Sequence, residues 1–500
     1  MADKEAARLL KAAIDTLEAA VVPSLTRDDS KIALDLVIRI LLRLQTRFSV
    51  QEEGIENLLG KAQGILDELS VSNPAGAAKV NVETPLDLLE AKRNKVEAAF
   101  GEHIPSLVAA AGKGDADALT TLTHILDSQR DYLALVDPDT LKGIAVVYQG
   151  GRIYRQHTEA PKALIDDASV GAALRHQFPD AEVTASKVKV LAGGFSKVTA
   201  LFTKDTKGAA SESLVMRRDL PQPFMNRPVV NEFPLLQKVY REGVHVAEPC
   251  WIEADASYVG GAFMVSRQVS GSSNPGEWQA HPGAAKSVAA DLAELLAKLH
   301  GLDLAQLGYG ADVTGKSAGQ GVADEVAWWA ARYAEWRSRD NPLLDIPLAW
   351  LQQNVPQHLF EMPARVVHGD VGFHNLMVDQ GKVTALLDWE FWHFGDPNED
   401  LAFARMFMNQ VGAWDDFIAR YRECGGIAFS AECERYFNVW TSVRNAIGCI
   451  DAGLRFNGAP MDKVELKYAV SGVLAPYIEL DSTALVMKYL GEKMDGRIQY

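Results

Sequence analysis

The sequence predicts an α+β protein with more than one domain, on three observations. Residues 1–150 carry apolar side chains at helical spacing almost throughout. From about residue 185 the pattern changes to short β-branched runs separated by glycines and turn residues, which is typical of an antiparallel sheet. Most of the remaining chain is again helical in pattern. We therefore predict an all-α bundle over 1–150, a small part with an antiparallel sheet over 151–270 and a larger helical part over 271–500.

Length and composition exclude several classes of protein. The chain has 500 residues, which exceeds what one core usually serves, and its 48% hydrophobic content excludes a mostly disordered chain. The net charge of -16 argues against nucleic acid as a partner, because phosphates would be repelled. Neither a signal peptide nor a run of about 18 apolar residues is found, so we expect a soluble, cytoplasmic protein without a membrane span. The four cysteines lack CxxC spacing, which favours free thiols.

The first 150 residues predict a bundle of helices whose breaks are Pro, Gly, Asn or Asp. One predicted helix carries Arg39, Arg43 and Arg47 on a single face. Such a stripe can bind an anion or a partner, although a solvated face with ion pairs is the commoner outcome. The predicted helices span residues 5–22, 31–49, 51–70, 85–112 and 116–136.

The strand-rich part predicts a phosphate-facing turn. Gly193 and Gly194 lie between two strands, where glycines let backbone N–H groups approach an anion. Strand alternation places Arg217 beside this turn, and a helix over 231–241 carries Glu232, which can pair with Arg217. The predicted strands are 187–191, 198–203, 214–217 and 262–270.

A Gly/Ser/Pro linker over 271–276 predicts a hinge before the helical part. A strongly periodic helix over 284–299 follows and ends at His300-Gly301. The helices predicted at 323–338 and 347–353 are rich in Trp and Tyr, which at this spacing are more often core than ligand contacts. Further helices are predicted from 411 to 500.

Residues 310–317 match the P-loop pattern GxxxxGK[ST] letter for letter. A working P-loop needs a buried strand before it and a helix that begins at the Lys-Ser pair. The preceding residues 302–307 look like the end of a helical segment, and the glycines of 318–321 are expected to break any helix after Ser317. We therefore interpret this segment as a connector.

The stretch from Arg365 to Arg405 holds the strongest chemical signal. One apolar run, 365–367, ends at His368-Gly369-Asp370, and a second, 383–387, ends at Asp388, with Asn375 between them. Carboxylate and amide oxygens at strand ends suit Mg²⁺ and a phosphate, and a further carboxylate can orient an attacking hydroxyl. The pattern predicts a compact site for phosphoryl transfer.

These motifs together resemble the aminoglycoside phosphotransferase and choline kinase family, whose fold is similar to that of protein kinases. The resemblance covers roughly residues 185–480 and implies a bilobal, protein-kinase-like fold. The first 150 residues resemble, more weakly, a helical domain found beside such kinases in bacteria. The matching motifs are GGFS (193–196), LVMR (214–217), Glu232, VVHGD-VGFH-N (366–375) and LLDWE-x₅-DP-x₂-DLA (386–402).

The resemblance implies roles for individual residues. Asp370 would be the catalytic base or hydroxyl-orienting carboxylate, with Arg217 as the catalytic cation, and Asn375 and Asp388 would hold Mg²⁺. ATP or GTP would be the co-substrate. Three residues would give structural support: His368, Asp396 and Asp400. Glu390 would be either a third metal-shell carboxylate or a surface residue. The nucleotide would be bound by Gly193, Gly194, Phe195, Ser196, Arg217, Glu232 and the hinge residues Ser266, Arg267 and Val269.

Three departures from the family pattern bear on the nucleotide site. Arg217 stands where the family often has Lys, which keeps the charge but changes its geometry. Pro234 follows Glu232 closely, and its ring clashes with the carbonyl four residues back unless the helix starts nearby, which bears on the pairing of Arg217 with Glu232. Lys197 follows the glycine turn and can add charge over the phosphates, although solvent exposure is the commoner outcome.

The leading functional hypothesis is an ATP- or GTP-dependent kinase acting on the hydroxyl of a small metabolite, an apolar alcohol or a hydroxyacyl compound. An aminoglycoside or choline-like amino alcohol is the alternative substrate. A second hypothesis is a non-catalytic nucleotide-binding scaffold or pseudokinase, and a third is a P-loop NTPase that uses Lys316. For the N-terminal helices, regulation, homodimerisation or binding of a partner, and presentation of substrate stay open.

Overall fold

The computed structural model describes residues 52–69, 85–136, 165–191, 196–220, 224–279, 281, 283–458 and 466–494, with short pieces between residues 11 and 46. The chain divides into two compact units. The sheet unit comprises Tyr154–Glu325 and Val355–Asn438, and the helical unit comprises Met1–Ile153, Val326–Asn354 and Val439–Tyr500. Both units are discontinuous in sequence, whereas the predicted division at 150 and 270 is sequential and stays a prediction. Most of the predicted helices 5–22 and 31–49, including Arg39, Arg43 and Arg47, lies outside the described residues.

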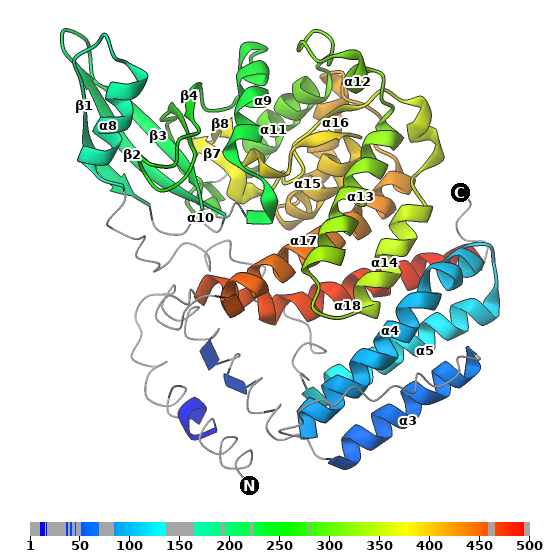
Figure 1. The fold of residues 1–500 in the computed structure, drawn as a ribbon. Helices are drawn as coiled ribbons and strands as arrows, with labels where there is room; N and C mark the ends of the chain where they lie inside the picture. Colours follow the sequence, from blue (N-terminus) through cyan, green and yellow to red (C-terminus); the bar gives the residue numbers. More distant parts are fainter. Residues whose placement is uncertain are drawn as a thin grey trace. The chain divides into compact units, whose positions relative to one another are not determined.

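The sheet unit contains an antiparallel sheet with the strand order β1-β2-β3-β5-β4 (Figure 1). Four of these strands correspond to predicted ones. The fifth, β4, was not predicted, because it is short and begins with a proline, which cannot donate to a strand ladder. The strands are β1 (Val183–Val190), β2 (Lys197–Thr206), β3 (Glu212–Asp219), β4 (Pro249–Glu253) and β5 (Phe263–Arg267).

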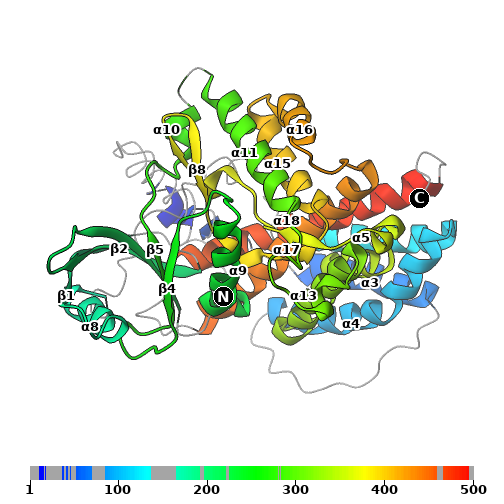
Figure 2. The same ribbon diagram turned by 90° about the horizontal axis from the view of Figure 1, so that it is seen from above.

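The helix α8 (Asp167–Gln177) packs on one face of this sheet and lies along β1 (Figure 2). The helix begins with a capping box, in which the Asp166 carboxylate accepts the Ser169 N–H and the Ser169 hydroxyl accepts the Asp166 N–H. Ala200, Phe202 and Met216 are buried beneath it. Because side chains alternate along a strand, the odd-numbered residues of β2 and β3 face the other side.

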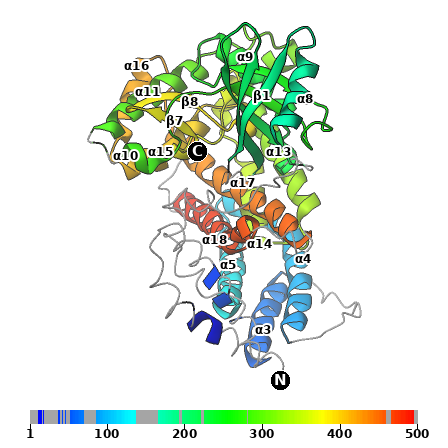
Figure 3. The same ribbon diagram turned by 90° about the vertical axis from the view of Figure 1, so that its left-hand side faces the viewer.

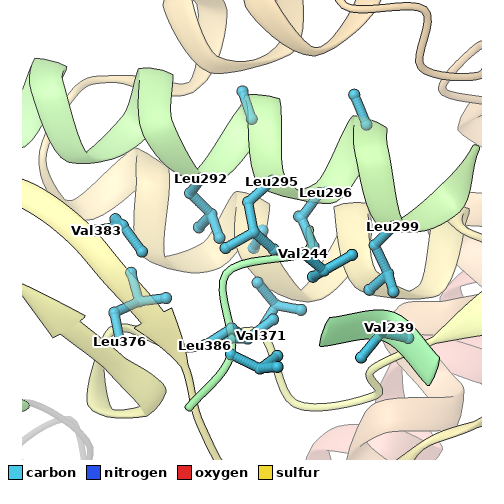
Figure 4. Close-up of a cluster of buried hydrophobic side chains, with 14 of the residues drawn as sticks. Val239, Val244, Leu292, Leu295, Leu296, Leu299, Val371, Leu376, Val383 and Leu386 are labelled. Atoms are coloured by element: carbon cyan, nitrogen blue, oxygen red, sulfur yellow. The ribbon is translucent and has the colours of Figure 1, made fainter. Parts of the chain in front are cut away.

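The second hydrophobic cluster of the sheet unit supports the predicted catalytic stretch. Leucines of α11 pack against the hairpin β7 (Leu376–Asp379) and β8 (Lys382–Leu386) (Figure 4). Val371 and Leu376, at the two ends of the loop that carries Asp370 and Asn375, are both buried in this cluster. The loop is therefore anchored on both sides by apolar contacts.

Strand pairing in this region differs from a simple hairpin between the two predicted strands. The first, β6 (Arg365–Val367), pairs with β9 (His393–Gly395), and the second, β8, pairs with β7. Neither β7 nor β9 was predicted, because a run of three or four residues is too short to show a period. Residues Asp379 to Lys382 make the turn that joins β7 to β8.

The remaining helices of the chain confirm the predicted α+β class. In the sheet unit they are α9 (Val229–Arg241), α10 (Pro275–Gln279), α11 (Ala284–His300), α12 (Ala311–Thr314), α15 (Asn398–Gln410) and α16 (Trp414–Glu423), with 3₁₀ turns at Phe224–Asn226, Gln357–Glu361, Phe373–Asn375 and Trp389–Phe391. Two helices, α13 (Ala318–Trp336) and α17 (Ala431–Gly458), contribute residues to both units.

The helical unit contains the three described N-terminal helices, and the predictions at 51–70, 85–112 and 116–136 are confirmed. These helices pack side by side (Figure 3), and α4 and α5 also contact α14 and α18. Within the unit, the buried Glu97 carboxylate pairs with Arg93 at 2.5 Å and Arg339 at 2.6 Å. Among the described residues, no helix has the length and apolar character needed to cross a membrane. The helices are α3 (Glu52–Glu68), α4 (Pro85–Gly112), α5 (Ala116–Val136), α14 (Pro342–Gln353) and α18 (Leu466–Met494).

Candidate active site

The site is built in the sheet unit from the face of the sheet opposite α8, on which α9 packs, and from the loops that follow β6 and β8. Arg217 lies on the odd-numbered face of β3, opposite Thr199 of β2. Its guanidinium makes two ion pairs, with Asp388 (Nη2 to Oδ1, 2.5 Å) and with Glu232 (Nη1 to Oε2, 3.3 Å). Arg218, one residue on, points the other way and donates to the Val259 carbonyl at 2.7 Å.

The question raised by Pro234 is answered by where α9 begins. The helix starts at Val229, so Pro234 lies in its second turn and only the Val230 carbonyl loses an N–H partner. The Asp219 carboxylate accepts the Val229 N–H at 3.1 Å and holds this helix start to the end of β3. Glu232 is consequently buried in the first helical turns and reaches Arg217.

The loop after β6 is fixed by Asp400 on α15. Its carboxylate accepts the backbone N–H groups of His368 at 2.8 Å and Gly369 at 2.7 Å, and it also contacts His300 Nε2 at 3.0 Å. Asp400 is fully buried. Burial raises its pKa, but these hydrogen bonds and the nearby histidines outweigh burial, and the net pKa lies below its usual range. Asp400 therefore stays ionised and clamps the backbone of the loop.

His368 connects the two loops of the site. Its Nε2 lies 2.9 Å from the Leu387 carbonyl, and its Nδ1 accepts the Asp370 N–H at 3.1 Å. One nitrogen must donate and the other accept, which is the pattern of a neutral imidazole. Burial accordingly lowers the pKa of His368. The neutral ring links the residue before Asp388 to the backbone of Asp370.

Asp370 and Asn375 lie at opposite ends of this loop and are joined by hydrogen bonds. The Asn375 amide donates to the Asp370 carboxylate at 2.8 Å and to its backbone carbonyl at 2.9 Å. His374 Nε2 lies 3.4 Å from the same carboxylate oxygen. These contacts fix the orientation of Asp370, whose side chain is 17% exposed and so can reach a bound hydroxyl.

Asp388 adopts a left-handed backbone conformation (φ 64°, ψ 67°), which is unusual for a residue other than glycine. Burial raises the pKa of its carboxyl, but Arg217 and then Lys197 more than offset this, so the net pKa is below its usual range. The side chain is 34% exposed despite its pairing with Arg217. Asp388 is therefore an ionised, accessible carboxylate.

The oxygen atoms of Asn375 and Asp388 are the candidate ligands for the implied Mg²⁺. Among the described residues, no group of three or more His, Cys, Asp or Glu side chains gathers as a metal site. Magnesium nevertheless needs only one or two carboxylates or other oxygens, with water and phosphate completing its shell. The Asn375 carbonyl oxygen accepts no hydrogen bond from the described residues, since its amide nitrogen makes both bonds to Asp370. Asn375 and Asp388 thus offer hard oxygen ligands that fit magnesium.

Lys197 and Glu390 belong to the same group of charged side chains as Arg217, Glu232 and Asp388, which the sequence did not predict. Lys197 is buried, contrary to the exposure expected as its commoner outcome, and its ammonium pairs with Glu232 at 2.7 Å and Glu390 at 3.0 Å. Glu390 is only 8% exposed, which contradicts the surface alternative, and the alternative of a third metal-shell carboxylate stays a prediction. The signal that could have revealed this is strand register, because Lys197, Thr199 and Arg217 share one face of the sheet.

The hinge is held by a close backbone contact. Ser272 and Val378 exchange two backbone hydrogen bonds, at 2.9 and 3.0 Å. Gly271 has φ of +106°, and a Cβ there would lie 2.4 Å from the Val378 carbonyl oxygen, so only glycine allows this approach. The linker is thereby fixed to the β7–β8 hairpin, beside the expected purine site.

The predicted purine-binding segment lies at the end of β5. The Arg267 side chain turns away to Glu212 and Glu248, at 2.8 Å each, so only its backbone is available for a nucleotide. The N–H groups of Arg267 and Gln268 bond to the carbonyls of Glu248 and Ser213. Within the described part of the chain, Val269 N–H has no such partner. Ser266 is a half-buried strand residue that pairs with Val215.

The glycine turn is only partly described. Gly193, Gly194 and Phe195 lie outside the described residues. Ser196 is buried, and its hydroxyl acts to lower the pKa of Glu390, although burial raises that pKa more strongly. The part of the turn that would face a phosphate therefore lies mostly outside the described residues.

Asp396 lies two residues before α15, the helix that carries Asp400. Its carboxylate accepts the Asn398 N–H at 2.9 Å and the Asn398 amide at 2.7 Å. Next to it, His393 pairs with the buried Glu399 at 3.1 Å. Burial lowers the pKa of His393, but the negative charges of Glu399 and then Glu325 raise it by more than burial lowers it. The net pKa is about 9. These contacts fix the helix that carries Asp400.

Residues 310–317 lack the geometry of a P-loop. The segment before them forms turns rather than a strand, and the short α12 occupies the middle of the motif. Lys316 lies on the surface and pairs with Asp324 at 2.6 Å. The prediction that the glycines of 318–321 break the helix is wrong, because α13 begins at Ala318. A Cβ on Gly321 would lie 2.1 Å from the Phe394 carbonyl, so glycine there permits close packing on β9.

Comparison with known proteins agrees with this geometry. Residues 187–433 match the sequence profile of the phosphotransferase enzyme family. This segment belongs to that family. The phosphotransferase segment includes all the described site residues named above, from Ser196 and Arg217 to Asp400.

Curated relatives are longer proteins. The chain is 27% identical over 277 residues to acyl-CoA dehydrogenase family member 11 of Gallus gallus, which covers 50% of this chain and 34% of the relative. It is 30% identical over 206 residues to the protein of that name from Mus musculus, covering 39% of this chain and 25% of the relative. The chain thus spans about a third or less of the length of these relatives.

Solved structures of phosphotransferases resemble most of the chain. A Ralstonia eutropha protein assigned to the aminoglycoside phosphotransferases aligns with a TM-score of 0.47 and 20% identity, over 64% of this chain and 98% of its own. Macrolide 2′-phosphotransferase from Brachybacterium faecium aligns with a TM-score of 0.42 and 18% identity, over 62% of this chain and 97% of its own.

Proposed function

We propose that the chain is an ATP- or GTP-dependent, Mg²⁺-requiring kinase that transfers the γ-phosphoryl group to the hydroxyl of a small metabolite. The observation that carries this proposal is the arrangement of Asp370, Asn375, Asp388 and Arg217 in one unit. An oriented carboxylate, two oxygen donors and a cation are the parts that phosphoryl transfer requires. Membership of the phosphotransferase family supports the same reaction class. A cytoplasmic location is part of the proposal.

Asp370 would accept the proton of the acceptor hydroxyl. Its carboxylate is held by Asn375 at 2.8 Å, so it is oriented before substrate binds. Arg217 would pair with the nucleotide phosphates and stabilise the charge of the transition state. Asn375 and Asp388 would hold magnesium, which when bound neutralises charge on the transferred phosphate. The N–H of Val269, at the hinge, would receive the purine.

The acceptor that we propose is a neutral alcohol with an apolar part, such as a hydroxyacyl compound. Next to Asp370, the ring of His374 packs on Phe407, which in turn contacts Phe373 and Phe403. Phe373 and Phe403 are buried, whereas His374 and Phe407 are partly exposed and suit an apolar group next to the hydroxyl. The name of the relatives, acyl-CoA dehydrogenase, also links proteins that share this segment with acyl groups. Amino alcohols, including aminoglycosides and choline-like compounds, are the alternative acceptors.

A non-catalytic nucleotide-binding protein is the second candidate. The observation that favours it is the contact between Arg217 and Asp388, because it occupies one oxygen of a proposed metal ligand. A kinase would have to exchange this contact when nucleotide binds.

The deciding experiment uses the purified chain with Mg²⁺, ATP or GTP and a mixture of hydroxyacyl compounds, simple alcohols and amino alcohols. Mass spectrometry identifies the compound that gains phosphate. Asp370→Asn should reduce transfer by about 10³-fold, as expected for loss of a general base. Asp379→Asn, at the end of β7 that is farther from the loop of Asp370, is the matched control and should retain activity. Unchanged transfer by Asp370→Asn would refute the assignment of the base, and absence of any product with the wild type would favour the non-catalytic candidate.

A further inference from the structure

Lys197 is a buried cation whose charge is paired inside the protein. Its side chain is 3% exposed. The ammonium forms an ion pair with Glu232 Oε1 at 2.7 Å, and it donates hydrogen bonds to Glu390 Oε2 at 3.0 Å and to the Arg227 carbonyl at 3.2 Å. A buried ammonium group is destabilising unless it keeps such partners. Lys197 therefore cannot bind a phosphate without giving up a partner.

Glu232 is shared between two cations, and the sharing is unequal. One carboxylate oxygen lies 2.7 Å from Lys197, whereas the other lies 3.3 Å from Arg217. The closer contact of Arg217 is with Asp388, at 2.5 Å. Lys197 is thus the nearer counter-ion of Glu232, and Arg217 is held mainly by Asp388, the accessible carboxylate of the site.

The charges of the cluster show why this division matters. Three carboxylates, from Glu232, Glu390 and Asp388, surround the two cations Lys197 and Arg217. Without Lys197, two buried carboxylates would lose their nearest cation, and Arg217 would be the remaining counter-ion. Its fork can bind a carboxylate with two N–H groups, so Glu232 would then hold it firmly. An arginine held in this way is less available to a ligand.

We propose that Lys197 is a positioning residue that neutralises Glu232 and Glu390 and thereby leaves Arg217 free to turn from Asp388 to the nucleotide phosphates. This inference rests on the proposed function, because it concerns how the nucleotide is bound. It assigns separate tasks to the two cations on one face of the sheet. Lys197 holds α9 and the loop after β8 to β2, and Arg217 is the exchangeable ligand-facing charge.

The experiment removes the charge of Lys197, alone or together with the charge of one of its carboxylate partners, and measures nucleotide affinity and stability. The probe for affinity is a fluorescent ATP analogue with Mg²⁺, and urea unfolding measures stability. Lys197→Met should weaken binding of the analogue by about tenfold or more, because Glu232 captures Arg217. Adding Glu232→Gln should restore most of this affinity, since a neutral amide no longer holds the guanidinium.

A second double variant separates positioning from mere structural support. Lys197→Met with Glu390→Gln should recover stability, because one uncompensated buried charge is removed, but it should not recover affinity, since Glu232 stays charged. Equal recovery of affinity by both double variants would overturn the proposal, as would wild-type affinity in Lys197→Met. Should Lys197→Met fail to fold, the two double variants still carry the comparison.

The outcomes also distinguish this inference from the proposed function. If the wild type does not bind the analogue, the proposed function fails, and this inference fails with it. If the wild type binds and the Lys197 variants bind equally well, only the inference about Lys197 fails.

Discussion

Residues 310–317 and the stretch that follows β6 both carry side chains suited to phosphate chemistry, and they differ in what surrounds them. Lys316 is exposed, follows the short helix α12 and forms an ion pair with Asp324. Asp370 and Asp388 instead lie on loops anchored by buried apolar residues and by the carboxylate of Asp400. Residues 310–317 match a known phosphate-binding motif at every position, but their surroundings do not hold the lysine in place. The loops of Asp370 and Asp388 match no P-loop motif, but their surroundings fix both side chains. Phosphate chemistry depends on charges that are held in place, which spacing alone does not supply.

The largest effect that we expect from a single side chain outside the base is at Asp388. Asp388→Ala should reduce phosphoryl transfer by about 10²- to 10³-fold, because it removes a proposed metal ligand and the partner of Arg217. Steady-state kinetics at increasing Mg²⁺ concentration would measure it. Asp312→Ala, an exposed carboxylate within the P-loop-like segment, is the control, and a comparable loss in that variant would reverse the comparison.

The ion pair of His393 with Glu399 predicts how stability depends on pH. The pKa of His393 is raised from 6.5 to about 9, so the folded state binds this proton more tightly than the unfolded chain. Its contribution, about 3 kcal/mol, should be fully present below pH 6.5 and should be lost as the pH rises through 9.

His393→Gln tests this prediction. The variant should be less stable than the wild type at low pH, and the difference should vanish above pH 9, as measured by urea unfolding across this range. His281→Gln, which alters an exposed histidine of the same unit, is the control. A constant difference at all pH values would contradict the assigned protonation.

Asp400→Asn should destabilise the sheet unit by about 2 kcal/mol, because an amide can accept only part of the hydrogen bonds that the carboxylate now accepts from the loop. Activity should fall as well, since His368 and Gly369 set the position of Asp370. Thermal unfolding and kcat would be measured together. Asp415→Asn on the exposed start of α16 should change stability by less than about 0.5 kcal/mol. Full activity in Asp400→Asn would show that the loop does not need this clamp.

Lys316→Ala should have the smallest effect. An exposed ion pair contributes at most about 1 kcal/mol, and nothing in its surroundings holds the lysine toward a ligand. Nucleotide affinity and transfer should both stay within about twofold of the wild type. Abolished turnover would instead identify residues 310–317 as the phosphate site and would reverse the comparison between the two regions.

The sequence by itself determined the α+β class and the main helices and strands, and it singled out residues 365–405 as the stretch that we propose to be catalytic. These are local properties: apolar periodicity, glycines at turns and carboxylates at strand ends. Strand alternation and helix position also raised the pairing of Arg217 with Glu232, a question that Pro234 left open and that the position of α9 answered.

Only the tertiary structure decided which charges pair. The register of β2 and β3 places Lys197 and Arg217 on one face of the sheet. Because α9 and the loop after β8 pack on that face, Lys197 is a buried partner of Glu232 and Glu390. Likewise, the clamp of Asp400 on the loop of Asp370 joins residues 30 or more positions apart. Such contacts depend on packing between distant segments, and no local pattern encodes the distance between two side chains.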